Sequence, residues 1–367
     1  MKVHLIIICS IILCAFYGCS SNTNKQLFDN NISIIDYSEF AQEIMPPSKT
    51  IKDNVHFIKL KMEDKQSLLK SFDKIAIYDQ ELYVLDTYTR KLVVFDWNGN
   101  PLKILNRKGR GPGEYLSIED FCIDPRKHIF ITDTRTSKVI EYDVGFNFVK
   151  SWNIPYVSNQ IVSLPNGNFL INLLPVNKGK YANVELLVVD SNFNDVKCVL
   201  KYDAPVSLNE VISLPRISCS KYGICYHRTV NDNVYILQSD GDLKEIISFN
   251  FGSLSVPEKH RENLEHNLNH YTNYVTLEEC YAVADNKIYG VLFDKSQEYM
   301  FVLNKSTNIL QKKKYECSPD RIGCTEYPIG TSDNYFITYA PYSVKYSNQD
   351  LKETEIDDYS VLCLYEI

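Results

Sequence analysis

Short runs of alternating hydrophobic and polar residues dominate the chain from Val55 onward. Runs such as KIAIYD, ELYVLD and KLVVFD are separated by Gly, Pro, Asn and Asp. Alternation at a period of two places hydrophobic side chains on one face of an extended strand, and the separating residues are those that form tight turns. The pattern therefore predicts an all-β domain over residues 55–367.

These strands recur as a repeated unit. Phe72–Leu105 aligns with Glu119–Trp152, so that Asp86 matches Asp133 at a separation of 47 residues. Each copy contains four short strands, and fainter copies continue to the C-terminus, giving six in all. A repeat of this length with four strands per unit is typical of a β-propeller. We therefore expect a six-bladed β-propeller of four-stranded antiparallel blades.

Two segments complete this architecture. The sixth unit lacks its last strand, and Val55–Lys61 has the alternation needed to supply it. An N-terminal strand that joins the C-terminal blade would close the ring and remove an exposed sheet edge. Residues 257–277 break the β pattern, because Leu264, Leu268, Tyr271 and Val275 recur at helical spacing. One short helical insertion is expected there.

The loop between the first two repeats resembles that of a known family. It reads Gly-Arg-Gly-Pro-Gly-Glu-Tyr over residues 109–115 and is followed by an inner strand ending at Asp124 and by IFITDTRTSKVIEYD. This arrangement resembles the NHL-type repeat of six-bladed β-propellers and, more narrowly, the six-bladed-propeller lipoproteins of diderm bacteria. Thr136 stands where NHL repeats usually have asparagine, and repeats three to six lack the glycine loop. The resemblance thus implies the fold but weakens the transfer of any ligand site.

The N-terminus predicts export. Residues 1–18 contain a lysine followed by an apolar run, which is the layout of a signal peptide. Phe16-Tyr17-Gly18-Cys19 resembles the lipobox of a bacterial lipoprotein, although that family prefers a small aliphatic residue in place of Phe16. We expect lipidation at Cys19, a polar tether over residues 19–54, and attachment to the outer membrane of the cell envelope by the lipid anchor only. An ordinary signal peptide or an uncleaved anchor is the alternative.

Charge argues against a nucleic acid partner. The chain has 39 Lys and Arg against 46 Asp and Glu, for a net charge of −7. An acidic domain without a basic patch interleaved with aromatic residues is not drawn toward nucleic acid.

The cysteines do not predict a metal or redox site. No Cys-x-x-Cys pair is present, and Cys122 and Cys363 fall inside predicted strands. Most are expected to be small buried hydrophobic residues. Cys219 with Cys225, and Cys317 with Cys324, are each spaced to close a short disulfide loop.

The glycine loop is not a phosphate-binding loop. It lacks a following helix and the lysine and hydroxyl residue of that motif. Its glycines and Pro112 are expected to form a turn. Arg110 and Glu114 remain, either as an ion pair that braces the turn or as ligand contacts.

Two Asp-Thr-x-Thr turns lie on the same predicted face as this loop and the helical insertion. A single carboxylate per turn is too few for calcium, so Asp86 and Asp133 are expected to cap their turns by binding backbone amides. Arg90 and Arg135 have less structural reason to be there, and they could reach an anionic ligand over the central channel.

Two histidines are the remaining candidates. His227 ends a predicted strand near the channel and is the histidine to test as an acid or base, with an ordinary turn histidine as the alternative. His270 shares one side of the predicted helix with Glu262 and His266, where a solvated polar face is favoured over a metal site because the His-Glu-x-x-His motif is missing. We predict no catalytic residue, no metal and no cofactor.

These features predict a binding or scaffolding propeller of the cell envelope, one that handles glycans if its many tyrosines stack on sugar rings. The alternatives are a propeller hydrolase or lyase with a site at the channel mouth, and a protein–protein interaction module of an envelope complex.

Overall fold

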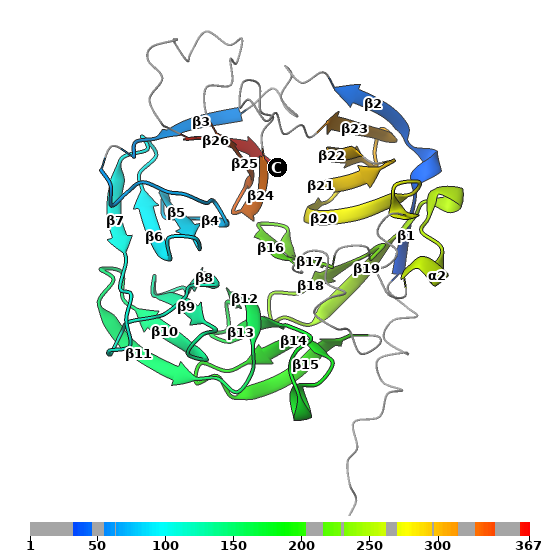
Figure 1. Ribbon diagram of the computed structural model, residues 1–367. Coiled ribbons are helices and arrows are strands. Elements are labelled where there is room, and N and C mark those ends of the chain that lie inside the picture. The colour runs from blue at the N-terminus through cyan, green and yellow to red at the C-terminus, as the bar shows by residue number, and fades with distance from the viewer. Residues whose placement is uncertain are drawn as a thin grey trace, which may run out of the picture.

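The computed structural model describes residues 32–45, 55–62, 64–202, 216–228, 231–261, 270–295, 297–314, 327–341 and 360–367. Six separate sheets radiate from a central axis (Figure 1). Each sheet has four antiparallel strands arranged from the axis outward, and two sheets carry a fifth strand. The predicted six-bladed β-propeller is confirmed.

Blades 1 to 3 follow one another along the chain, each with its innermost strand first. Blade 1 contains β4 (Lys74–Tyr78), β5 (Glu81–Asp86), β6 (Lys91–Phe95) and β7 (Pro101–Leu105). Blade 2 contains β8 (Asp120–Ile123), β9 (Ile129–Asp133), β10 (Lys138–Tyr142) and β11 (Phe148–Asn153). Blade 3 contains β12 (Ser158–Ser163), β13 (Phe169–Leu173), β14 (Val184–Val189) and β15 (Asp195–Lys201).

Blades 4 to 6 complete the ring in the same order. Blade 4 contains β16 (Arg216–Ser220), β17 (Gly223–His227), β18 (Asn233–Leu237) and β19 (Leu243–Asn250). Blade 5 contains β20 (Val275–Ala284), β21 (Lys287–Asp294), β22 (Gln297–Asn304) and β23 (Ile309–Lys314). Blade 6 contains β24 (Tyr327–Ser332), β25 (Tyr335–Pro341), β26 (Ser360–Glu366) and β3 (Val55–Leu60).

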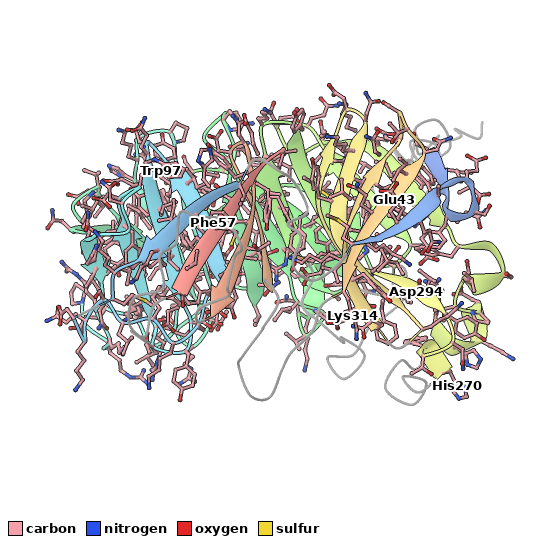
Figure 2. The ribbon with its side chains drawn as sticks, turned by 90° about the horizontal axis from the view of Figure 1, so that it is seen from above. Glu43, Phe57, Trp97, His270, Asp294 and Lys314 are labelled. Carbon is pink, nitrogen blue, oxygen red and sulfur yellow. The ribbon has the colours of Figure 1, made fainter. Side chains whose placement is uncertain are left out.

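The chain ends close the ring in blade 6. β3 pairs antiparallel with β26, with Lys59 opposite Val361 and Phe57 opposite Cys363. The N-terminal strand is therefore the outer strand of the C-terminal blade, as predicted (Figures 1 and 2).

The residues before β3 do more than tether the domain. β1 (Ile32–Asp36) pairs in parallel with β19, and β2 (Ala41–Met45) pairs in parallel with β23. The 3-10 helix η1 (Tyr37–Glu39) joins them, and Tyr37 packs edge-on against Phe251 at 5.3 Å. The expectation of a polar tether over residues 19–54 is therefore corrected for residues 32–45, which form strands because each finds an open blade edge.

The hydrophobic core lies between neighbouring blades. Every residue of β6, β9 and β13 is buried, because a central strand is covered on both faces by the adjacent blades. Leu92 of blade 1 and Phe121 of blade 2 are fully enclosed in one such layer. Burial of a side chain of this size stabilises the fold by about 2–3 kcal/mol.

A repeated aspartate ends the third strand of blades 1 to 3. Asp96, Asp143 and Asp190 follow one another at the 47-residue period. Each accepts hydrogen bonds of 2.8–3.0 Å from the backbone amides two and four residues ahead and from an asparagine side chain. These bonds fix the turn into the outer strand, and they lower the pKa of all three carboxyls.

The propeller has two distinct faces. One face, which we call the insertion face, carries the loops that enter the inner strands, the β5–β6 and β9–β10 turns, and residues 251–261 and 270–274. The hairpin face carries the tight β4–β5, β16–β17 and β24–β25 turns. Labelled side chains mark the two faces: Trp97 lies at one edge of the molecule and His270 at the other (Figure 2). The predicted sharing of one face by the glycine loop, the Asp-Thr-x-Thr turns and the insertion agrees with the strand register, in which Asp86 is opposite Lys91 and Lys74 is opposite Leu85.

The described part of the insertion contains helix, as predicted, at Glu258–Arg261 and again at His270 and Tyr271. The helix α2 (Glu258–Arg261) has four residues and follows the 3-10 turn η4 (Gly252–Leu254). Val275, which was expected on the helix, instead begins β20, where it is fully buried. Leu264, Leu268, Glu262 and His266 lie outside the described residues. One further 3-10 turn, η2 (Gly179–Tyr181), precedes β14.

Candidate functional site

A cavity of about 480 Å³ occupies the centre of the ring, a size typical of ligand pockets. Its walls are β4, β8, β12, β16 and β24, the inner strands of five blades. The inner strand of blade 5 is missing from the lining because β16 contacts β24 directly, and Figure 1 shows β20 set back from both. The channel is therefore an asymmetric, five-walled cavity.

One ion pair joins blades 1 and 2 in this cavity. The Lys74 Nζ lies 2.8 Å from Asp120 Oδ1 and donates to the Phe121 carbonyl at 2.7 Å. Asp120 is 2% exposed and also accepts from the backbone amide of Ile161 at 2.8 Å. Burial raises the pKa of Asp120, and the attraction of Lys74 opposes that shift. The pair thus links three consecutive blades.

A second ion pair joins blades 4, 5 and 6. Arg216 donates to the Ile329 carbonyl at 2.6 Å, and its Nε lies 3.4 Å from Glu279 Oε2. The guanidinium stands 5.5 Å from the centre of the Tyr281 ring, a cation–π contact. Burial raises the pKa of Glu279 while Arg216 lowers it.

The neighbouring Glu278 is the extra residue of a β-bulge in β20, between Leu277 and Glu279. A bulge turns two successive side chains toward the same region, which places Glu278 and Glu279 close together. Burial raises the pKa of Glu278 to about 7, with smaller contributions from Glu298 and Glu279.

Side chains of adjacent blades also seal the exposed edges of the inner strands. The Ile77 amide donates to Ser332 Oγ at 2.7 Å, and the Ile217 amide donates to the Gln160 side chain. An inner strand is an edge strand, so these amides would otherwise lack partners. These contacts hold the blades together. The cavity side chains that make them do not form a nucleophile–base pair.

The glycine loop is a turn, as predicted, but it is braced differently. Glu114 accepts from the Gly111 amide at 2.8 Å, and the Glu114 amide donates to the Gly111 carbonyl at 3.0 Å. Tyr115 is fully buried, and its hydroxyl accepts from the Arg107 amide. Among the described residues, Arg110 and Glu114 do not form an ion pair. The exposed Arg110 side chain remains a predicted ligand contact. Carboxylate-to-amide bonding takes the place of the predicted charge pair.

The Asp-Thr-x-Thr turns are capped as expected. Asp133 accepts from the Leu116 and Ser117 amides and from the Thr136 hydroxyl at 2.7–3.2 Å, which ties the turn to the loop entering β8. Asp86 makes the equivalent bonds to Lys70 and Thr89 at 2.7 Å.

The two arginines of these turns differ. Arg90 donates to the Leu116 carbonyl at 3.0 Å, so its side chain joins blade 1 to the inter-blade loop. Arg135 is exposed on the insertion face, and only its backbone amide has an assigned bond among the described residues. Of the pair, Arg135 keeps the geometry of a possible ligand contact.

His227 does not reach the channel mouth. It is 2% exposed, its Nε2 lies 2.8 Å from the Asn231 carbonyl, and burial lowers its pKa to about 4. This corrects the expectation of an acid or base near the channel, because a side chain inside the blade cannot meet a ligand there. The ordinary turn histidine is the better description.

His270 is exposed and stacks on His260, with ring centres 4.6 Å apart. It lies on the insertion helix segment, away from the cavity lining. Within the part of the chain that the structure describes, no group of three His, Cys, Asp or Glu side chains is placed to hold a metal ion.

The described cysteines form no disulfide with one another. Cys219 and Cys225, spaced for a disulfide, do not pair with each other. The Cys225 sulfur instead lies 3.6 Å from that of Cys280 in blade 5. Cys317, Cys324 and the predicted lipidation site Cys19 lie outside the described residues.

The sequence did not reveal a second hollow, at the hairpin-face mouth of the channel. This mouth has a volume of about 1130 Å³ and meets the central cavity at Ile77, Tyr78, Cys219 and Ser332. Trp97 and Tyr335 line it from blades 1 and 6. Trp97 is one of only two tryptophans in the chain, and it lies in a turn. A tryptophan in a turn was the feature of the sequence that could have indicated this hollow.

Fold and cavity together define a six-bladed β-propeller with a ligand-sized central channel. The chain belongs to the 6-bladed beta-propeller family DUF5128, whose match spans residues 22–339. None of the curated proteins matches the chain. Within the described residues, no helix is long and apolar enough to cross a membrane.

Solved structures show the same fold at low sequence identity. A putative exported protein from Bacteroides fragilis superposes with a TM-score of 0.71 at 18% identity, covering 91% of this chain and 100% of its own. A member of the DUF4221 family from Bacteroides vulgatus gives a TM-score of 0.54 at 11% identity, covering 86% of this chain and 96% of its own. These similarities support the fold alone.

Proposed function

We propose that this protein is a lipid-anchored propeller of the bacterial cell envelope that binds a glycan without transforming it. The observation that carries the proposal is the central cavity of about 480 Å³. Its ion pairs Lys74–Asp120 and Arg216–Glu279 join neighbouring blades, and His227 is buried away from it. A cavity whose charges serve the scaffold suits binding better than acid–base chemistry, which requires a group within reach of the substrate.

The address follows from the N-terminus. Residues 1–18 have the layout of a signal peptide, and Phe16-Tyr17-Gly18-Cys19 resembles a lipobox. The similar structure from Bacteroides fragilis is described as a putative exported protein, which supports export. Loss of palmitate labelling in Cys19→Ala is the expected result, and continued labelling of that variant would refute the anchor.

The ligand class is tested with the purified full chain on a glycan array, followed by analysis of the bound glycan after long incubation. Binding with recovery of intact glycan supports the proposal. Release of shortened or unsaturated products would establish the hydrolase or lyase instead.

A second candidate, a protein-binding module, is favoured by the outer strands of blades 4 and 5. Ile34 of β1 and Ile44 of β2 are 71% and 68% exposed. Edge strands that carry exposed apolar side chains are suited to pairing with a strand of a partner. Recovery of the same envelope protein by cross-linking wild type, and its loss in Ile34→Lys/Ile44→Lys, would support this candidate.

A further inference from the structure

We infer that the hairpin-face mouth of the channel is the saccharide-binding site and that it selects neutral saccharides; this inference rests on the proposed glycan-binding function and gives it a location. The mouth is a hollow of about 1130 Å³ that narrows into the central cavity. The turns around it come from blades 1, 3, 4 and 6. A funnel of this shape admits the end of a chain-like ligand.

Aromatic rings form one wall of the mouth. Trp97 and Tyr335 meet edge to face with their ring centres 6.0 Å apart, and His56 meets Tyr335 in the same way at 6.0 Å. These contacts fix the rings, while Trp97 and Tyr335 remain half-buried and His56 exposed. Rigid aromatic rings provide contact area at little entropic cost. The C–H faces of a pyranose ring match such a wall.

Unpaired polar groups stand around the aromatic wall. The side chains of Gln80 and Asp333 are exposed and have no hydrogen-bond partner among the described residues. Both residues lie in tight hairpins at positive φ, 61° and 51°, and turns of this kind hold their residues in a fixed position. The Lys221 ammonium lies nearby, 5.1 Å from the Tyr222 ring centre. An amide, a carboxylate and an ammonium offer the donors and acceptors that sugar hydroxyls need.

The charge of the mouth favours a neutral ligand. The carboxylates among its described lining residues are Asp79, which pairs with Lys127, and Asp333, which has no ion-pair partner there. No arginine is among the described residues that line it, although arginine forks are the usual partners of carboxylate, sulfate and phosphate groups. The Lys221 ammonium is balanced by Asp333 and Asp79 by Lys127, so the described lining residues offer no excess positive charge to a uronic acid or a sulfated saccharide.

The two tryptophans of the chain make a direct test possible. In Trp152→Phe, Trp97 is the sole tryptophan, and its emission reports on the mouth. Titration of this variant with cellohexaose, maltohexaose, xylohexaose and chitohexaose is expected to give a saturable change with at least one of them. In Trp97→Phe, the remaining Trp152 lies between blades 2 and 3 against Phe130 and Phe193, and its emission should not change.

Calorimetry with the same sugars measures the contribution of each group. Trp97→Ala and Asp333→Ala are expected to weaken binding at least tenfold, and Asp333→Asn less than Asp333→Ala. Melting curves establish that each variant is folded, and Trp97→Phe serves where the alanine variant is not. Polygalacturonate is the anionic comparison and is expected not to bind.

The outcomes separate the site from the function. If Trp97→Ala and Asp333→Ala bind a neutral saccharide with an affinity within twofold of wild type, this site is overturned but the glycan-binding function is kept. Binding of polygalacturonate in preference to the neutral sugars overturns the selectivity. Absence of binding to every saccharide overturns both the site and the glycan-binding function.

Discussion

Arg216 of blade 4 donates a hydrogen bond to the backbone carbonyl of Ile329 in blade 6, across 2.6 Å. The intervening blade 5 is tied to the same guanidinium through Glu279 and the Tyr281 ring. One side chain therefore holds three blades in the part of the ring that also contains the closure between β3 and β26. This contact sets the inner strand of blade 5 back from the channel, and so determines the shape of the cavity.

Replacing Arg216 with methionine is expected to destabilise the protein by roughly 1–3 kcal/mol, because Glu279 and the Ile329 carbonyl lose their partner. The side chains of Arg216 and Glu279 are 29% and 22% exposed, and solvent screening keeps the effect below that of a fully buried pair. Urea unfolding measures it. The double variant Arg216→Met/Glu279→Gln should recover part of the loss.

The matched control is a surface pair. Lys180, whose side chain is 68% exposed, lies 2.7 Å from Asp195, and Lys180→Met should leave the unfolding midpoint unchanged. If Arg216→Met lowered the unfolding midpoint no more than Lys180→Met, the contacts of Arg216 would not stabilise the junction between the blades.

The glycine loop contains one position that requires glycine. Gly113 has a φ of +68°, and a Cβ there would lie 2.6 Å from Phe148 Cβ. Gly113→Ala is expected to cost about 2–4 kcal/mol, the sum of left-handed strain and overpacking. Gly111→Ala is the control: its Cβ would meet only the flexible end of Glu114, at 3.1 Å, and it should cost about 1 kcal/mol or less. Thermal unfolding compares them, and a Gly113→Ala variant as stable as Gly111→Ala would contradict the structure.

The parts of the fold that were predictable from the sequence depend on local, repeated chemistry. Asp86 and Asp133 cap equivalent turns with bonds to nearby amides. Because the same residue recurs at each equivalent turn, the 47-residue repeat can be read from one sequence. The ring closure by β3 was predictable because an unpaired strand must find an edge. Residues 32–45 were not, since ISIID and AQEIM become strands only when β19 and β23 offer their edges in parallel.

The candidate site was harder to predict, because it is assembled from distant residues. Arg216 and Ile329 are 113 positions apart, and Trp97 meets Tyr335 only after blades 1 and 6 have become neighbours. Neither contact can be predicted from secondary-structure propensity or from the repeat period. Two of the charged residues that were predicted as ligand contacts bind backbone groups instead. Arg90 donates to the Leu116 carbonyl of the inter-blade loop, and Glu114 accepts from an amide of its own turn.

Two titratable groups at the junction of blades 4 and 5, Glu278 and His227, should give opposite pH dependences. The pKa of Glu278 is about 7 in the folded protein against an ordinary value of 4.5. From pH 4.5 to 7 the folded state retains a proton that the unfolded state has lost, so its contribution to stability falls as pH rises. The pKa of His227 is about 4 against 6.5. From pH 6.5 down to 4 the unfolded state gains a proton that the folded state refuses, so stability falls as pH drops.

Each contribution is on the order of 3 kcal/mol at full extent, and the two oppose each other between pH 4.5 and 6.5. Relative to wild type, Glu278→Gln should therefore gain stability as pH rises from 4.5 to 7.5. Relative to wild type, His227→Asn should gain stability as pH falls from 6.5 to 4. Urea unfolding across this range measures both differences. Parallel profiles for wild type and either variant would refute the corresponding shift.

The cysteines should react in the order of their burial. Cys198 is exposed, whereas Cys122 and Cys225 are 7% and 3% exposed. Burial raises the pKa of the Cys122 thiol and raises that of Cys219 to about 11. The hydrogen bond to the Cys280 sulfur, followed by burial, raises the pKa of Cys225. Because the thiolate is the reactive form, iodoacetamide at pH 8 is expected to modify Cys198 before Cys122 and Cys225 in the native protein. Peptide mass spectrometry follows each site, and the urea-unfolded chain, in which Cys122, Cys198 and Cys225 should react at similar rates, is the control. Native labelling of Cys225 as fast as that of Cys198 would mean that blades 4 and 5 separate readily, and that their junction is not the closed layer seen here.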